Sequence, residues 1–169
     1  MSDDFQVTVF ADDRRIEALA SYTDHLEELA SIFADAHAGD GELLDRRPDP
    51  DSWSVGEILH HLADAELRQS LRLREMLASE SPSWAAWDQE AYADSLGYNV
   101  RPAADALTLI LSLRHVNARL LALLAPEQWA RTAIHPVFGE VDVARWVEIS
   151  VDHLKTHVLQ ARRAVLGMN

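Results

Sequence analysis

The chain has 169 residues, of which 48% are hydrophobic and 25% are charged, so it has the composition of a folded globular protein and not of a disordered one. Its 28 Asp and Glu residues outnumber its 15 Lys and Arg residues, which gives a formal net charge of -13 and a surface that repels nucleic acid and anionic lipid. This length is typical of one domain, so we expect a single domain over residues 1–169 with no nucleic acid or membrane partner.

The first four residues, Met1-Ser2-Asp3-Asp4, are acidic where a secretory signal is basic. No stretch of the chain approaches the roughly 20 apolar residues that a transmembrane helix needs. We therefore expect a cytoplasmic protein.

Proline residues divide the chain into four long proline-free segments, and each segment has room for one helix. In the first segment, apolar residues recur three or four positions apart over residues 12–37 and two glycines follow, so the spacing predicts one continuous helix. The second helix starts at a capping box, in which the Ser54 hydroxyl and the Glu57 carboxylate each accept a hydrogen bond from a free backbone N–H group. Its apolar periodicity extends to about Leu77.

The stretch of residues 79–99 lacks helical periodicity and is rich in aromatic residues, so we expect a long loop with one short helix near residues 88–95. Pro102 suits the first position of a third helix, which ends before the next proline. Residues 135–139 are typical of a turn or short extended loop, and Asp142 is a good N-cap for a fourth helix that extends to Leu166. These elements predict an all-α protein, a four-helix bundle with a long loop between its second and third helices.

Cysteine and histidine have unusual frequencies in this chain. The absence of Cys excludes disulfides, thiolate metal ligands and a nucleophilic cysteine, so any thiol chemistry needs an external thiol. The eight His residues are about twice the number that an average composition would give. His153 and His157 are four residues apart on the fourth helix, a spacing that lets both imidazoles reach the same metal ion.

The direction of each histidine on its helix selects a third candidate. His153 and His157 lie at the edge of the apolar face of the fourth helix. His61 lies at the edge of the apolar face of the second helix, whereas His60 is predicted to face solvent. Three imidazoles from two helices would leave coordination positions open for water or substrate, which is typical of catalytic metals. A histidine at such an edge is also often a hydrogen-bonded boundary residue, and the sequence does not show that the two helices are neighbours.

Several short motifs, in the same order along the chain, resemble those of the DinB/YfiT-like superfamily over roughly residues 20–166. The matching segments are Trp53-Ser54 with His61 eight residues after the tryptophan, His135-Pro136, Gly139-Glu140-Val141, and His153-xxx-His157 with Gln160. The resemblance implies a four-helix bundle, commonly a homodimer, in which His61, His153 and His157 hold a divalent ion such as zinc or nickel. It also implies metal-dependent enzymes that use low-molecular-weight thiols, while other members have been called hydrolases.

The resemblance and the open three-histidine site together suggest a function. We expect a metal-dependent transferase that activates an external low-molecular-weight thiol for attack on an electrophilic small-molecule substrate. The alternatives are a metal-dependent hydrolase that uses a metal-activated water, and a noncatalytic, stress-related bundle that only binds the metal. No protein side chain is assigned as the catalytic nucleophile.

Other residues near the motifs allow a functional and a structural interpretation. Asp64 and Asp152 could orient a ligand histidine, but a solvated position is the more common outcome for such residues. His135 is expected to stabilise a turn, and Trp53 to anchor the core. Four aromatic residues are expected to fix the long loop on the bundle more than to line a pocket: Trp84, Trp87, Tyr92 and Tyr98. Four histidines are expected at ordinary surface or boundary positions: His25, His37, His60 and His115.

Overall fold

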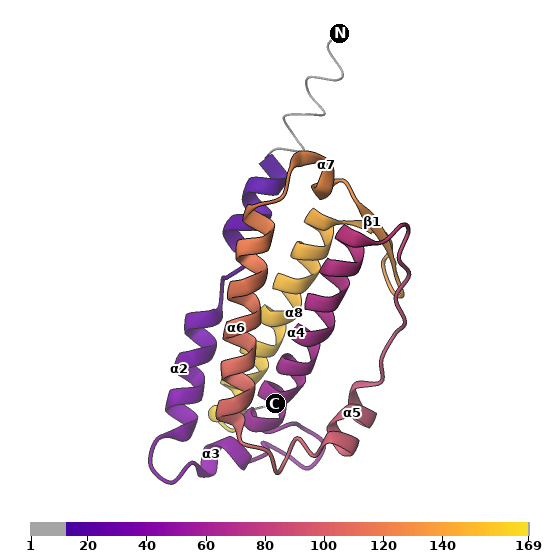
Figure 1. Cartoon of the computed structure of the whole chain (residues 1–169). Coiled ribbons are helices and arrows are strands. Elements are labelled where there is room, and N and C mark those ends of the chain that lie inside the picture. Colours follow the sequence, from indigo (N-terminus) through magenta and orange to yellow (C-terminus); the bar gives the residue numbers. More distant parts are fainter. Residues whose placement is uncertain (1–12, 169) are drawn as a thin grey trace.

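The computed structural model describes residues 13–168, and it shows four long helical segments packed side by side (Figure 1). The first segment comprises residues 13–21 and α2 (Leu26–His37), and the other three are α4 (Val55–Ala78), α6 (Ala103–Ala122) and α8 (Val143–Val165). The connections contain α3 (Glu42–Asp45), α5 (Gln89–Leu96), α7 (Pro126–Trp129), β1 (Thr132–His135) and β2 (Gly139–Asp142). The predicted four-helix bundle is confirmed. None of the described helices is long and apolar enough to cross a membrane.

The long helices α4 and α8 begin at the predicted capping residues. The Ser54 hydroxyl accepts a hydrogen bond from the Glu57 N–H at 3.3 Å, and the Glu57 carboxylate accepts one from the Ser54 N–H at 2.8 Å. At the start of α8, Asp142 Oδ1 accepts a hydrogen bond from the Arg145 N–H at 2.7 Å. Pro102 is the N-cap of α6 and not its first helical residue, because its ψ of 115° is extended.

The first helical segment is broken, although its apolar spacing predicted one continuous helix. Residues 22–25 form a turn, in which His25 has a left-handed φ of 67°. The Tyr22 side chain is fully buried at this turn, and its carbonyl oxygen accepts a hydrogen bond from the Arg114 guanidinium of α6 at 3.0 Å. Because the helix is interrupted here, the Tyr22 carbonyl makes no helical hydrogen bond and can pair with the buried Arg114. The spacing of apolar residues continues across the break, so it does not reveal the turn.

The directions of the helices explain the long connection that follows α4. α4 packs against α6 and α8, and α2 packs against the same two helices. In Figure 1, α4 and α6 run in the same direction, opposite to α2 and α8. Two parallel neighbours cannot be joined by a tight turn, so the chain returns along the outer side of α4 before α6 starts (Figure 1). We call this connection, residues 79–102, the crossover segment.

β1 and β2 form an antiparallel hairpin, in which His135 pairs with Gly139 at the turn. The sequence predicted a turn or short extended loop at residues 135–139, and the turn is present. The two flanking strands were not predicted, because strands of four residues are too short for an alternating pattern to stand out. The hairpin also binds the crossover segment. The Ile134 N–H donates to the Pro82 carbonyl at 2.9 Å, and the Ile134 carbonyl accepts from the Trp84 N–H at 3.0 Å. These bonds hold one end of the crossover segment against the bundle.

Candidate metal centre

The three candidate ligand histidines converge on one point between α4 and α8. His61 Nε2 lies 3.3 Å from His153 Nε2 and 3.1 Å from His157 Nε2. Each of the three residues offers a ring nitrogen, and these nitrogens all lie within 4.8 Å of one another. They meet because α4 and α8 are neighbours in the bundle, which the sequence alone did not show. The fold therefore assembles a group that could hold a metal ion.

All three imidazoles are neutral at pH 7, because burial favours the uncharged ring. Burial, and to a smaller extent repulsion from a protonated His157, lower the pKa of His61 and of His153 to about 3. Burial also lowers the pKa of His157. Neutral imidazole is the form that binds zinc- or nickel-type ions, and three such rings form an all-nitrogen donor set that fits an ion of this kind.

Gln160 fixes the orientation of the His157 ring. His157 Nδ1 lies 2.8 Å from Gln160 Oε1. Because an amide oxygen accepts hydrogen bonds and cannot donate them, Nδ1 carries the proton and the Nε2 lone pair points toward the other two histidines. A cation among the three nitrogens would make this close approach of lone pairs favourable.

Two tryptophans orient the His61 ring. Trp87 of the crossover segment stacks on it, with ring centroids 5.3 Å apart and planes 11° apart, and the Trp53 centroid lies 5.0 Å away. His61 Nδ1 is buried without a hydrogen-bond partner among residues 13–168, so ring contacts hold this histidine in place. Trp53 packs on the core as predicted, and it also contacts a candidate ligand.

The two acidic residues that could have oriented a ligand histidine have other surroundings. Asp64 Oδ2 accepts a hydrogen bond from the Tyr98 hydroxyl at 2.6 Å, and Asp152 is exposed on α8. Tyr98 is itself buried, so it fixes the crossover segment on α4, as predicted for the loop aromatics.

The remaining histidines lie outside the cluster. His60 is buried, although its position on the helix predicted a solvent-facing side chain. The crossover segment covers this face of α4, since Tyr98 stacks on the His60 ring and the Arg101 carbonyl accepts a hydrogen bond from His60 Nε2 at 3.1 Å. His135 stabilises its turn as predicted, because its Nδ1 accepts hydrogen bonds from two backbone N–H groups of the turn at 3.1 and 3.3 Å. Three further histidines do not join the cluster: His25, His37 and His115.

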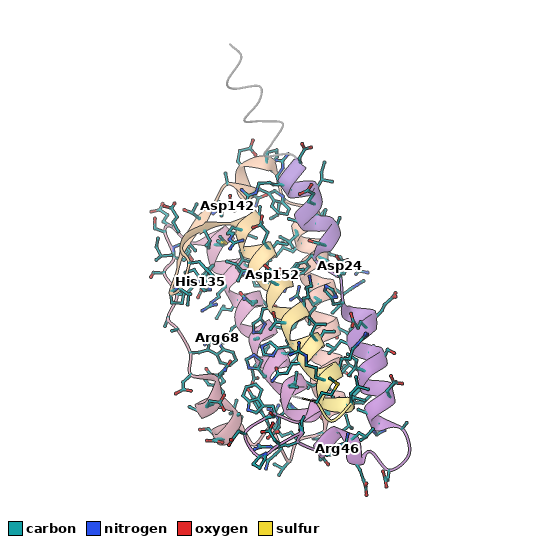
Figure 2. All side chains as sticks on the ribbon, turned by 180° about the vertical axis from the view of Figure 1, so that it is seen from behind. Asp24, Arg46, Arg68, His135, Asp142 and Asp152 are labelled. Atoms are coloured by element: carbon teal, nitrogen blue, oxygen red, sulfur yellow. The ribbon has the colours of Figure 1, made fainter. Side chains whose placement is uncertain are left out.

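A cavity of about 270 Å³ lies beside His153. Its walls come from α4, α8, the hairpin turn and the crossover segment, and they include Arg68, Arg72, Trp87, Phe138, Ile149 and His153. Figure 2 shows Arg68 between α4 and the crossover segment, with His135 on the same side of the bundle. A small molecule in this cavity would contact the His153 ring directly.

Known proteins share both the sequence pattern and the fold. The family model of the DinB superfamily matches residues 14–161. The chain belongs to the DinB superfamily. This DinB protein is similar to two proteins of Oceanobacillus iheyensis that are both named "Putative metal-dependent hydrolase". One is 31% identical over 117 residues, which cover 69% of this chain and 67% of the relative, and the other is 29% identical over 153 residues, which cover 89% and 83%.

The solved structure of YfiT from Bacillus subtilis has the same fold as this DinB protein. The two structures align with a TM-score of 0.77 at 20% sequence identity, over 92% of this chain and 89% of YfiT. YfiT is described as having an unusual four-helix bundle topology. In this DinB protein, the parallel pairing of α4 with α6 requires the crossover segment.

Proposed function

We propose that this DinB protein is a metal-dependent enzyme in which His61, His153 and His157 bind a divalent ion of the zinc or nickel type, and in which an external low-molecular-weight thiol attacks an electrophilic small molecule. The observation that carries this proposal is the convergence of three neutral imidazole nitrogens beside a cavity. Three protein ligands leave room for a further ligand from solution.

The cavity walls favour a thiol over water as the nucleophile. Among the described residues that line the cavity there is no Asp or Glu, so none of them offers a carboxylate base. A free thiol has a pKa of about 8.5 and bulk water a pKa of about 15.7, so a thiol loses its proton with far less assistance. The chain has no Cys, so the thiol must come from solution.

The chain's own residues position the reactants. Gln160 keeps His157 in the tautomer that a metal requires, and the stacked Trp87 keeps the His61 ring in place. Trp87 and Ile149 give the cavity apolar walls next to His153. When bound, a divalent ion would supply Lewis acidity that lowers the pKa of the nucleophile.

Water is the second candidate nucleophile, because the similar Oceanobacillus iheyensis proteins are named as hydrolases. The same three histidines and the same cavity would serve, with an ester or amide as substrate. The two functions differ in one measurable requirement, since only the transferase needs an added thiol.

The test of function compares these nucleophiles on the metal-loaded protein. We expect zinc- or nickel-loaded protein to accelerate conjugation of monochlorobimane with at least one of bacillithiol, mycothiol, glutathione or coenzyme A. The His61→Ala variant should lose this activity, and the exposed-histidine variant His115→Ala should keep it. If the protein hydrolyses an ester or amide without a thiol and shows no conjugation, the proposed transferase is wrong and the protein is a hydrolase.

The test of the site measures metal content directly. We expect about one ion per chain in the wild type and in His115→Ala, and a clear loss in each of His61→Ala, His153→Ala and His157→Ala. Undiminished stoichiometric metal in all three variants would eliminate the proposed site. If metal removal lowers the melting temperature but no substrate is turned over, the protein is the noncatalytic metal-binding bundle.

We also propose that the protein forms a homodimer, as the family resemblance implies. Sedimentation velocity should then give twice the mass of the chain at micromolar concentration. A single species with the mass of one chain would contradict this.

A further inference from the structure

Two arginines of α4 line the cavity and form no ion pair with a described residue. Arg68 and Arg72 are one helical turn apart, and both line the cavity that contains His153. Neither forms an ion pair with a described residue. Acidic residues outnumber basic ones by 28 to 15 in this chain, so two adjacent arginines that form no ion pair with a described residue call for an explanation.

Most hydrogen-bond donors of these arginines are available to a ligand. Arg68 Nη2 and Arg72 Nη2 both donate to the Ala85 carbonyl, at 3.2 and 3.0 Å, and this is the one hydrogen bond that the described residues supply to each side chain. A guanidinium has five N–H donors in a fixed planar arrangement. Arg68 Nε is buried without a partner among these residues. A structural role in holding Ala85 would use only a small part of this donor set.

Aromatic rings hold both guanidinium groups in place. The Arg68 guanidinium lies 5.3 Å from the Trp87 ring centroid, and the Arg72 guanidinium lies 5.1 Å from the Trp84 centroid. Arg72 is only 8% exposed, and its burial together with the charge of Arg68 lowers its pKa, an effect that Glu75 partly offsets. Two like charges held close together in a partly buried site are a preorganised receptor for an anion.

The rest of the cavity limits what kind of anion fits. Val137 and Phe138 of the hairpin turn and Ile149 of α8 line it with apolar surface. A hydrated inorganic ion would leave these surfaces without contacts, whereas an organic anion would cover them. A carboxylate matches the planar donor arrangement of a guanidinium in a two-point hydrogen bond.

We propose that Arg68 and Arg72 bind the carboxylate of a small organic acid whose apolar part occupies the cavity beside His153. One part of this inference rests on the proposed function, namely that the acid is one of the two reactants. The binding of the acid itself does not rest on it, because the arginines do not take part in metal binding. The carboxylate belongs either to the electrophile or to the thiol. In either case it binds at Arg68 and Arg72. Arg68 and Arg72 are therefore specificity-determining residues, and the enzyme prefers anionic reactants.

The binding test uses paired probes that differ only in charge. Calorimetry should show that 3-phenylpropionate, phenylacetate or benzoate binds at least 10-fold more tightly than its own neutral amide. Arg68→Gln and Arg72→Gln should each reduce this preference at least about 5-fold. Arg119→Gln, which makes the same charge change at an exposed position of α6, should leave it unchanged. Arg72→Lys keeps the charge at this buried position, so it can be measured if Arg72→Gln does not fold.

The outcomes separate this inference from the proposed function. Equal affinity for acid and amide across the series, or an unchanged preference in both Arg68→Gln and Arg72→Gln when these variants are folded, overturns the arginine site. The His157→Ala variant should lose metal and keep the preference for the acid, so a failure of the metal site is seen separately. The conjugation assay then compares a charged with a neutral electrophile, and a charged with a neutral thiol. The reactant whose charge increases the rate is the one that carries the carboxylate.

Discussion

At the scale of single residues, one amide controls which nitrogen of His157 faces the histidine cluster. Gln160 Oε1 accepts a hydrogen bond from the His157 Nδ1–H group, which leaves Nε2 free to bind a metal. We expect Gln160→Leu to weaken zinc binding by about 10–100-fold, which competition with a chelating dye would measure. Gln160→Glu should retain the affinity because a carboxylate also accepts this hydrogen bond. Equal affinities of the wild type and the leucine variant would contradict the assignment.

A second residue-scale feature is the buried ion pair between Glu66 of α4 and Arg114 of α6. Both side chains are at most 1% exposed, and Arg114 also donates to the carbonyls of Tyr22 and Ser150. Arg114→Met leaves the Glu66 carboxylate buried without its partner, so we expect the free energy of unfolding to fall by about 3–5 kcal/mol in urea denaturation. The double variant Glu66→Gln, Arg114→Met removes both charges and should recover part of this loss. A cost below about 1 kcal/mol for Arg114→Met would show that the pair is not buried in solution.

At the scale of elements, the start of α4 determines where His61 lies. The Ser54 hydroxyl caps this helix, and Ser54 is buried together with Glu57, whose carboxylate also pairs with Arg47. Removing the hydroxyl leaves a helix N–H without its acceptor, so Ser54→Ala should lower the free energy of unfolding by about 1 kcal/mol. Ser112→Ala, at an exposed position of α6, provides the control and should change stability by less than about 0.5 kcal/mol. Chemical denaturation of the two variants side by side tests this.

At the scale of the whole molecule, the buried histidines make the metal-free protein sensitive to acid. The pKa values of His61 and His153 are about 3 in the folded state and about 6.5 in an unfolded chain. Between these values the unfolded state binds more protons, so the free energy of unfolding falls as the pH falls, by up to about 1.4 kcal/mol per pH unit for each histidine. Urea denaturation from pH 7 to pH 5 should show this slope. A variant with both histidines changed to asparagine should have a shallower one, and equal slopes would contradict the prediction.

Helix patterns identified most of this fold, and the exceptions have physical causes. Apolar periodicity gave the four long helices. Residue direction on each helix made His61, His153 and His157 candidates, and the family resemblance selected them as a set. His60 was placed wrongly because a helix pattern carries no information about the crossover segment that covers it. The break at His25 was missed because apolar spacing continues through it.

The sequence contains only a weak signal of the cavity arginines. Charged residues on a helix are usually solvated, so Arg68 and Arg72 looked ordinary until the crossover segment and the hairpin turn were seen to enclose them. Two arginines one helical turn apart, in a chain with few basic residues, were the only available signal.

The separation of the ligand histidines along the chain has a consequence for synthesis. His61 is 92 residues from His153 and 96 from His157, and α8 is synthesised after α4. Until α8 docks against α4, a nascent chain presents His61 alone, which cannot hold a metal ion tightly by itself. Tight metal uptake is therefore delayed until α8 has been synthesised and has docked, and a chain that terminates before α8 has neither His153 nor His157.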